Sequence, residues 1–536
     1  MKFISLLLAT ALSFCAVAAP SAAQYHEDNR LGFKVYTPKK WTSIPISSDE
    51  GWVVAKFLSP KPYFFTDKDL GYTYEHKPNM EVIAFLSDKY KEDEVTAETD
   101  EDGKVKRFTI KLTNPYKTYS EYLKGTYSGG GFYIAEEEQE TVGDYLVTKY
   151  VIKVEKQARG PKRLVTWVYH TADIDFAVQV ECFESAYDKL KRDIKKVMGS
   201  FEEIPRTEGT VSRSGVTGAS LVIEMDDMTP KDRAKSRKDR EKSTAKEAKR
   251  TLTDGWSYME AGPFMIVHHG EEKQAKMWAT RGEAVYKFCE KTFPYLGKEE
   301  HVSRLLVRIC KDYDEAVAFS PAIWTPFRPL EFVIYRDNVG VGSFQHQLFN
   351  RFLMEHWLRQ KDSNLYFNMP PWMKFGMSRM IGNAKLKGKK LVLKPSDWEN
   401  MGLREEVKAG TAHTPREIFL SNTDSFQDDN FAYEASALMR FLLDGAGSKS
   451  RLTKGLVEDY FMNLGEVMMA IDEEEDDDDR GEATTEEEEE ARYKARQAKA
   501  KELEQRVIEE TFAATFGSWS DKDWLQFEKL YFKAIK

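Results

Sequence analysis

The sequence predicts an α+β protein with two domains, and three observations lead to that fold class. The chain has 536 residues, which is too long for one ordinary domain. Between residues 25 and 205, short apolar runs alternate with turn residues, a pattern typical of antiparallel strands with few helices. From Gly255 onward, longer patterns of helical period separate a few strands, which predicts a mainly helical domain with a small sheet at its start.

The composition narrows the class of protein. Hydrophobic residues make up 41% of the chain and aromatic residues 13%, which is enough for sizeable cores. The net charge of −9 comes mostly from local acidic runs, and the chain lacks the basic balance of a general nucleic-acid binder. After the N-terminal segment no stretch has about 18 uninterrupted apolar residues, so no transmembrane span is predicted.

Residues 1–23 have the pattern of a secretory signal peptide. Lys2 precedes an apolar run from Phe3 to Ala19, and the small residues Ser21–Ala23 form a suitable cleavage site. Cys15 follows Phe14, where a lipoprotein signal requires a small residue. We therefore expect a soluble protein that is secreted or periplasmic after cleavage near Ala23.

The N-terminal domain, residues 24–205, is expected to be an antiparallel sheet with helices packed on it. Its predicted strands are Leu31–Tyr36, Met80–Leu86, Arg107–Leu112, Tyr145–Val154, Leu164–His170 and Phe176–Cys182, and a helix at Tyr187–Met198 closes the unit. The opening Gly32–Trp41, the strand Asp175–Cys182 and the ending Ser200-Phe201 resemble the PsbP/Mog1-like α/β/α sandwich domains. That family shares no catalytic residues, so the resemblance implies binding or scaffolding.

Residues 206–252 are predicted to be a charged flexible linker. Thr207–Gly218 is rich in Ser, Thr and Gly, and Lys231–Lys242 is dense in charge with few apolar residues to bury. Two structures fit this segment, a solvated helix and a disordered tether. Docking of the basic run onto an anionic surface is the functional alternative.

The C-terminal domain, residues 253–536, starts with strands and helices in alternation. The predicted strands are Pro263–His269, Leu305–Cys310 and Glu331–Tyr335, and the predicted helices between them are Gln274–Phe293 and Tyr313–Phe319. His268 and His269 point to opposite faces of their strand, which indicates polar residues of an edge strand rather than a metal site. Cys182, Cys289 and Cys310 lie in apolar patterns typical of buried thiols, with a Cys289–Cys310 disulfide as the alternative.

Two consecutive helices within residues 340–382 carry the candidate site. A zinc metallopeptidase requires His-Glu-x-x-His, because residues i and i+4 share a helix face and both reach the metal, while the Glu acts as general base. The chain reads His346-Gln347-Leu348-Phe349-Asn350 here, so one His of that pattern is present. A carboxamide such as that of Gln347 cannot serve as a base at neutral pH.

The surrounding segments resemble a gluzincin-type, peptidase MA-like domain. The resemblance rests on Gly262–Val267, the helix from Phe344, and three further segments: Met369–Met380, Tyr433–Leu442 and Val507–Ile535. It implies that Gln347 replaces the general base, Asn350 the second His ligand and Phe375 the Glu ligand. It also implies that Tyr433 is a residue of the cleft, and that residues 472–490 are an acidic insert between helices of this domain.

The predicted function is that of an exported, non-catalytic pseudo-metallopeptidase. It would bind an unknown protein or peptide ligand or act as a scaffold, without a cofactor and without nucleic acid. The alternative is an active hydrolase or peptidase with a site rebuilt around His346. Zinc enters only in that alternative, and His346 is then the candidate ligand.

Overall fold

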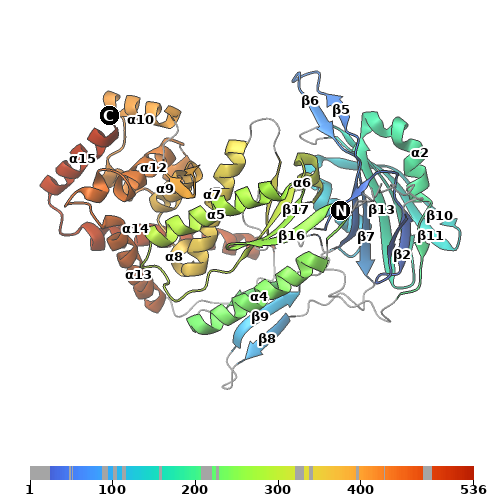
Figure 1. Cartoon of the computed structure of the whole chain (residues 1–536), viewed down its shortest axis with the longest axis horizontal. Helices are drawn as coiled ribbons and strands as arrows, with labels where there is room; N and C mark the ends of the chain where they lie inside the picture. The colour runs from blue at the N-terminus through green and yellow to red at the C-terminus, as the bar shows by residue number, and fades with distance from the viewer. Residues whose placement is uncertain are drawn as a thin grey trace, which may run out of the picture. The chain divides into compact units, whose positions relative to one another are not determined.

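The computed structural model describes most of the chain between residues 25 and 535 (Figure 1). The segments outside the description are 1–24, 47–49, 51, 87–94, 100–104, 112–115, 156–159, 207–219, 225–227, 251, 320–330, 337–341, 394–396, 428, 475–485 and 536. The predicted signal peptide therefore lies outside the described residues. The chain forms two compact units, the first of Met1–Val95 with Ile110–Leu221, the second of Thr96–Thr109 with Val222–Lys536.

The first unit is built on a seven-stranded sheet in which every neighbouring pair is antiparallel. Its order is β10 (Phe132–Val142), β11 (Tyr145–Val154), β12 (Lys162–His170), β13 (Ile174–Phe183), β7 (Asn79–Leu86), β4 (Val53–Leu58) and β3 (Thr42–Ser43). A small sheet of β1 (Tyr25–Asp28), β2 (Phe33–Tyr36) and β14 (Glu202–Glu203) and the hairpin β5 (Tyr63–Thr66) with β6 (Thr73–His76) complete its strands.

Each face of this sheet carries its own apolar core, because strand residues alternate between the two faces. One core includes Phe33, Phe176 and Val197 and is covered by α2 (Tyr187–Met198). The other includes Ile83 and Tyr122 and is covered by α1 (Tyr119–Tyr127). Short 3-10 turns, η2 (Ser128–Gly130) and η3 (Glu184–Ala186), follow α1 and precede α2. The antiparallel sheet with helices packed on it is confirmed.

The second unit contains a four-stranded mixed sheet. The order is β16 (Trp256–Ala261), β17 (Phe264–His269), β18 (Leu305–Cys310) and β19 (Glu331–Tyr335), antiparallel for the first pair and parallel for the other two. The expectation of an edge strand at His268 and His269 is wrong, because β16 covers that side of β17. A further sheet has the order β15 (Ser220–Glu224), β9 (Val105–Lys111) and β8 (Val95–Thr99).

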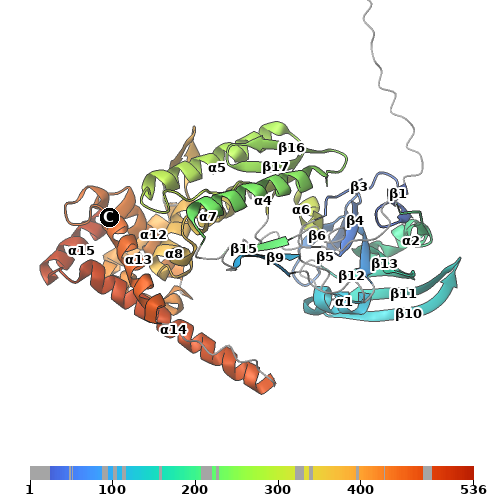
Figure 2. The same ribbon diagram turned by 90° about the horizontal axis from the view of Figure 1, so that it is seen from below.

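The rest of the second unit is mainly helical, as predicted (Figure 2). The elements are α4 (Pro230–Arg250), α5 (Glu272–Thr292), α6 (Tyr313–Phe319), α7 (Gly342–Lys361), α8 (Ser363–Phe367), α9 (Pro371–Gly382), β20 (Lys385–Lys387), β21 (Lys390–Val392), α10 (Asp397–Ala409), α11 (Pro415–Phe419), η4 (Thr423–Gln427), α12 (Asp429–Leu443), η5 (Gly447–Lys449), α13 (Leu456–Glu474), α14 (Glu486–Phe516) and α15 (Asp521–Ile535). No described helix is long and apolar enough to cross a membrane.

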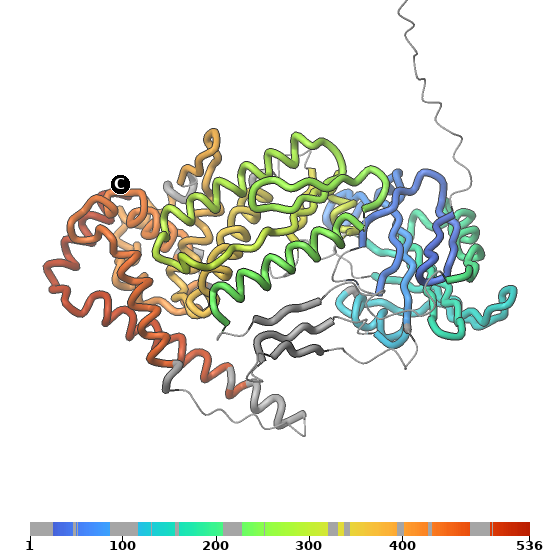
Figure 3. Tube along the Cα trace, turned by 60° about the horizontal axis from the view of Figure 1, so that its bottom comes forward, coloured from blue at the N-terminus to red at the C-terminus, as the bar shows by residue number. Residues whose placement is uncertain are grey.

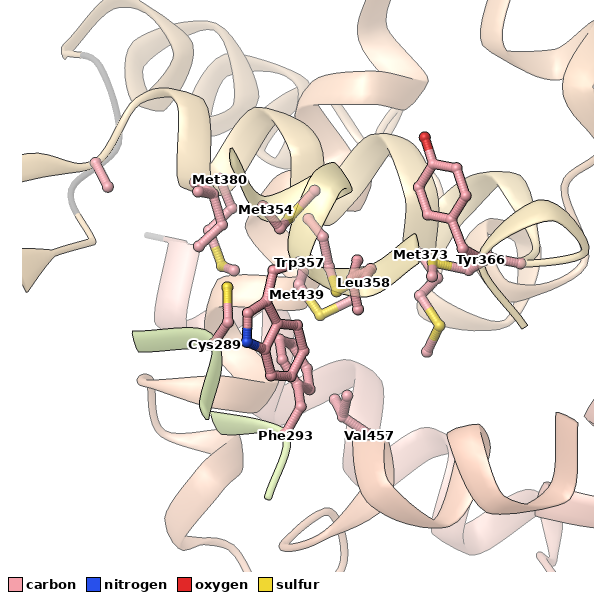
Figure 4. Packing of buried hydrophobic residues seen from close by; sticks show 14 of the residues in the cluster. Cys289, Phe293, Met354, Trp357, Leu358, Tyr366, Met373, Met380, Met439 and Val457 are labelled. Atoms are coloured by element: carbon pink, nitrogen blue, oxygen red, sulfur yellow. The ribbon is translucent and has the colours of Figure 1, made fainter. Parts of the chain in front are cut away.

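One apolar cluster connects the mixed sheet with these helices. Trp357 of α7 is 1% exposed and lies beside Cys289 and Phe293 of the α5 segment (Figure 4). Cys182, Cys289 and Cys310 are buried free thiols, so the buried-thiol prediction is confirmed and the Cys289–Cys310 disulfide is not formed. Burial of these thiols agrees with the apolar patterns around them.

Residues 230–250 form a packed helix, which corrects the flexible part of the linker prediction. α4 runs alongside the rest of the second unit (Figure 3). One guanidinium nitrogen of Arg237 donates to the carbonyls of His301 at 2.8 Å and Gln360 at 2.9 Å and to Glu300 Oε2 at 3.2 Å. The helix is therefore held by buried polar contacts, which a low apolar content does not reveal. Thr207–Gly218, the other part of the predicted linker, lies outside the described residues.

The acidic insert predicted at 472–490 lies between α13 and α14, and both of its ends are helical. Residues 472–474 complete α13, and residues 486–490 begin α14. Residues 475–485 lie outside the description. The prediction of a segment between two helices agrees with this order of elements.

Candidate functional site

The aromatic contact of His346 with Trp278 brings α7 and α5 together at the predicted site. The ring centroids are 4.8 Å apart, and Trp278 also packs on Phe349 at 5.1 Å. Burial lowers the pKa of His346 to about 4, and the positive charge of Arg281 acts in the same direction. The imidazole is therefore neutral near pH 7, and its charged neighbour is a cation.

Asn350 is a structural residue in this arrangement. Its side chain is fully buried, and its Nδ2 amide donates to the carbonyls of Ile381 at 3.1 Å, Gly382 at 3.4 Å and Ala384 at 3.2 Å. The last carbonyls of a helix have no partner within the helix, so this amide supplies a donor to the end of α9. Asn350 thus joins α7 to α9.

Phe375 is not brought to His346 and Asn350. Its ring stacks on Phe426 of η4, with centroids 4.8 Å apart and planes at 15°. Asn350 lies opposite Ile381, which follows Phe375 by six residues on α9. Six residues span about 9 Å along the helix axis at 1.5 Å per residue. Ser378 hydrogen-bonds to Glu355, which places this part of α9 next to a later turn of α7. Phe375 therefore contacts η4 and precedes, along α9, the residues that contact Asn350.

Gln347 and Tyr433 have contacts of different kinds. The main-chain carbonyl of Gln347 lies 3.5 Å from where a Cβ on Gly382 would be, so this turn of α7 packs closely on α9. The guanidinium of Arg379 lies 3.6 Å from the centroid of the Tyr433 ring. Tyr433 thus contacts a cation from α9.

The structure also forms a His–Glu pair that the sequence did not place. His413 Nδ1 and Glu434 Oε2 are 2.7 Å apart, and the main-chain N–H of His413 donates to Glu434 Oε1 at 2.9 Å. Burial raises the pKa of Glu434, and the bonds from His413 oppose that shift. Glu434 directly follows Tyr433 in the predicted cleft helix, but no spacing in the sequence connects it with His413. The pair fixes the loop before α11.

Glu355 and His356, further along α7, make contacts of their own rather than with His346. His356 Nδ1 lies 2.7 Å from the hydroxyl of Tyr286, and the two rings are stacked at 6°. Burial lowers the pKa of His356 to about 4, assisted by the charges of three arginines. Burial raises the pKa of Glu355. Both side chains belong to packing contacts between helices.

The residues around His346 do not fit a zinc ion. A catalytic zinc takes three protein ligands, whereas Asn350 directs N–H donors at carbonyls and Phe375 has no ligand atom. Arg281 places a positive charge near the His346 imidazole. In the described part of the chain, no group of three His, Cys, Asp or Glu residues is arranged to hold a metal.

No family model and no curated protein sequence matches the chain. Solved structures similar to it include PsbP (CyanoP) from Synechocystis sp. PCC 6803, at 13% identity and a TM-score of 0.23, covering 36% of this chain and 98% of that one. LpqN from Mycobacterium tuberculosis, described as involved in cell envelope biogenesis, has 10% identity and a TM-score of 0.20, covering 32% of this chain and 83% of that one.

TM-scores below 0.5 define neither the fold nor a function, so the description of the first unit rests on its strand order and its two cores. The gluzincin-type resemblance of residues 253–536 stays a proposal.

Proposed function

We propose that the chain is an exported, non-catalytic protein that uses a degenerate gluzincin-type domain to bind a protein or peptide ligand. The N-terminal PsbP/Mog1-like domain acts in this proposal as a scaffold or second binding module. Export rests on the signal pattern of residues 1–23. Periplasmic or secreted location and the absence of a required cofactor belong to the same proposal.

The observation that carries the proposal is the role of Asn350. A residue in the second-ligand position that donates to three main-chain carbonyls has a structural function, and its side chain is 0% exposed. The neutral His346 and the cationic Arg281 add an environment that repels a metal ion. Both features support loss of the zinc-dependent reaction.

Elemental analysis and a peptidase assay on the purified mature chain test the proposal. We expect a zinc content well below one ion per chain. We also expect no cleavage of a pool of random hexapeptides, as monitored by mass spectrometry. Equilibrium dialysis of the same pool should show that a subset of intact peptides is retained. Absence of any retained peptide would overturn the binding role.

The variant His346→Ala separates the proposal from the alternative hydrolase. In a rebuilt active site, the wild-type chain would contain about one zinc or cleave peptides, and His346→Ala would lose that activity. His356→Ala is the matched control, because His356 is also a partly buried histidine of α7 but contacts Tyr286 instead. Activity that depends on His346 but not on His356 would establish the hydrolase.

A further inference from the structure

Trp278 presents a buried hydrogen-bond donor at the contact between α5 and α7. The residue is 3% exposed, and its indole nitrogen has no hydrogen-bond partner among the described residues. An indole N–H can only donate. A buried donor without an acceptor destabilises the fold, so this position is suited to an acceptor from a bound molecule.

Arg281 adds a second set of donors on the same face of α5. It follows Trp278 by three residues, and side chains at this spacing are neighbours on a helix surface. Burial lowers the pKa of Arg281, and among the described residues no carboxylate acts against that shift. Partly buried arginines are ordinarily paired with an anion, so a guanidinium that has no anionic partner in the described part of the chain is informative.

His346 supplies the third donor from α7. Its ring lies 4.8 Å from the Trp278 ring, and the side chain is only partly buried, so solvent reaches this side of the contact. A neutral imidazole has one N–H donor and one acceptor. The three side chains therefore carry several donors and a single acceptor.

We propose that Trp278, Arg281 and His346 form a binding site for a carboxylate, such as the C-terminal carboxylate of a peptide. This inference rests on the proposed function in taking a peptide as the ligand. The two carboxylate oxygens accept hydrogen bonds from the Arg281 guanidinium in a bidentate arrangement. One of these oxygens also accepts from the Trp278 indole, and the other also accepts from His346.

The charge of the site favours a carboxylate over a phosphate. One guanidinium supplies a single formal positive charge, which matches the single negative charge of a carboxylate. A phosphate group carries about −1.5 to −2 near pH 7 and would keep an unmatched charge here. A metal cation is disfavoured by the same guanidinium.

The test follows the Trp278 indole resonance by NMR in the full chain labelled with ¹⁵N-tryptophan. The chain has 11 tryptophans, and Trp278→Phe assigns the resonance by its loss. The probes are N-acetylglycine, its neutral analogue N-acetylglycinamide and inorganic phosphate, at constant ionic strength. We expect a saturable shift with N-acetylglycine, no shift with the amide, and at least tenfold weaker binding of phosphate.

Two variants make the test specific. Arg281→Gln should weaken N-acetylglycine binding by about tenfold or more, as expected for loss of a charge-assisted contact. Lys276→Gln removes the same charge from an exposed position of α5 and should leave binding unchanged. Equal shifts with acid and amide, tighter binding of phosphate, or a response retained in Arg281→Gln would each overturn the proposal.

Zinc content separates this inference from the proposed function. If the chain holds stoichiometric zinc and cleaves peptides while the indole response depends on Arg281, the proposed function is wrong and the carboxylate site stands. If zinc and cleavage are absent and the indole does not respond, the carboxylate site alone is wrong.

Discussion

The Nδ2 amide of Asn350 donates to the carbonyl of Ile381 at 3.1 Å and so joins α7 to the end of α9. Asn350→Ala removes this donor and leaves the carbonyls of Ile381, Gly382 and Ala384 buried with one partner fewer. We expect a loss of about 1–3 kcal/mol in the free energy of unfolding, measured with chemical denaturant. Asn364→Ala, at an exposed position of α8, is the control and should change stability by less than about 0.5 kcal/mol. Equal effects of the two variants would contradict the structural role of Asn350.

The combined variant Gln347→Glu, Asn350→His and Phe375→Glu restores the residue types of a zinc peptidase. We expect it to bind no stoichiometric zinc, because position 375 lies about 9 Å along α9 from the residue opposite Asn350. The charge of Arg281 also opposes a cation at His346. Elemental analysis of the folded variant gives the answer, with circular dichroism as the check on folding. One zinc per folded chain would show that α7 and α9 keep the family geometry.

Local patterns in the sequence predicted much of the fold. The strand Tyr145–Val154 is β11 with the predicted ends, since alternation of apolar residues depends only on neighbours in the chain. For residues 230–250 the sequence fits both a helix and a disordered segment, because the contacts of α4 are polar, as Arg237 shows. A helix that is held by hydrogen bonds from a buried guanidinium needs no amphipathic stripe, so its sequence lacks that signal.

The candidate site was predicted less completely than the fold. The sequence identified His346 and Asn350 by position, but the direction of the Asn350 amide depends on how α9 ends. The contact between Trp278 and His346 joins segments far apart in the chain, so no spacing could indicate it. The pair of His413 and Glu434 was missed for the same reason.

Close packing of α9 on α12 depends on Gly376. A Cβ added there would lie 2.7 Å from the carbonyl oxygen of Ala435, which is backbone and cannot rotate away. Gly376→Ala should therefore lower the free energy of unfolding by about 1–3 kcal/mol. Gly465→Ala is the matched control in α13, where an added Cβ meets nothing within 4 Å. Gly465→Ala should raise the free energy of unfolding by about 0.5–1 kcal/mol through helix propensity. A lower free energy of unfolding for Gly465→Ala would contradict the open space described around Gly465.

Stability should fall in acid because His356 is buried in its neutral form. Its pKa is about 4 in the folded chain against the ordinary value of 6.5, since burial and three nearby arginines oppose its charge. Between these two values the unfolded chain binds a proton that the folded chain does not, so stability rises with pH across this window. The contribution of His356 amounts to about 3 kcal/mol between pH 7 and pH 4. Denaturant unfolding at several pH values should show a flatter profile for His356→Gln than for the wild type.

Lys56 of β4 is a buried cation held between two carboxylates in the first unit. The residue is 2% exposed, and its Nζ lies 2.7 Å from Glu50 and 3.4 Å from Glu81, its cross-strand neighbour. Lys56→Met removes this cation from between two carboxylates that repel each other, so we expect a loss of about 3–5 kcal/mol in the free energy of unfolding. Lys61→Met, at an exposed position after the same strand, is the control and should have little effect. Adding Glu81→Gln to Lys56→Met should recover part of the loss, because it removes one of the two negative charges that repel each other. Denaturant unfolding measures all four chains, and a double variant no more stable than Lys56→Met would show that volume, not charge, sets the cost.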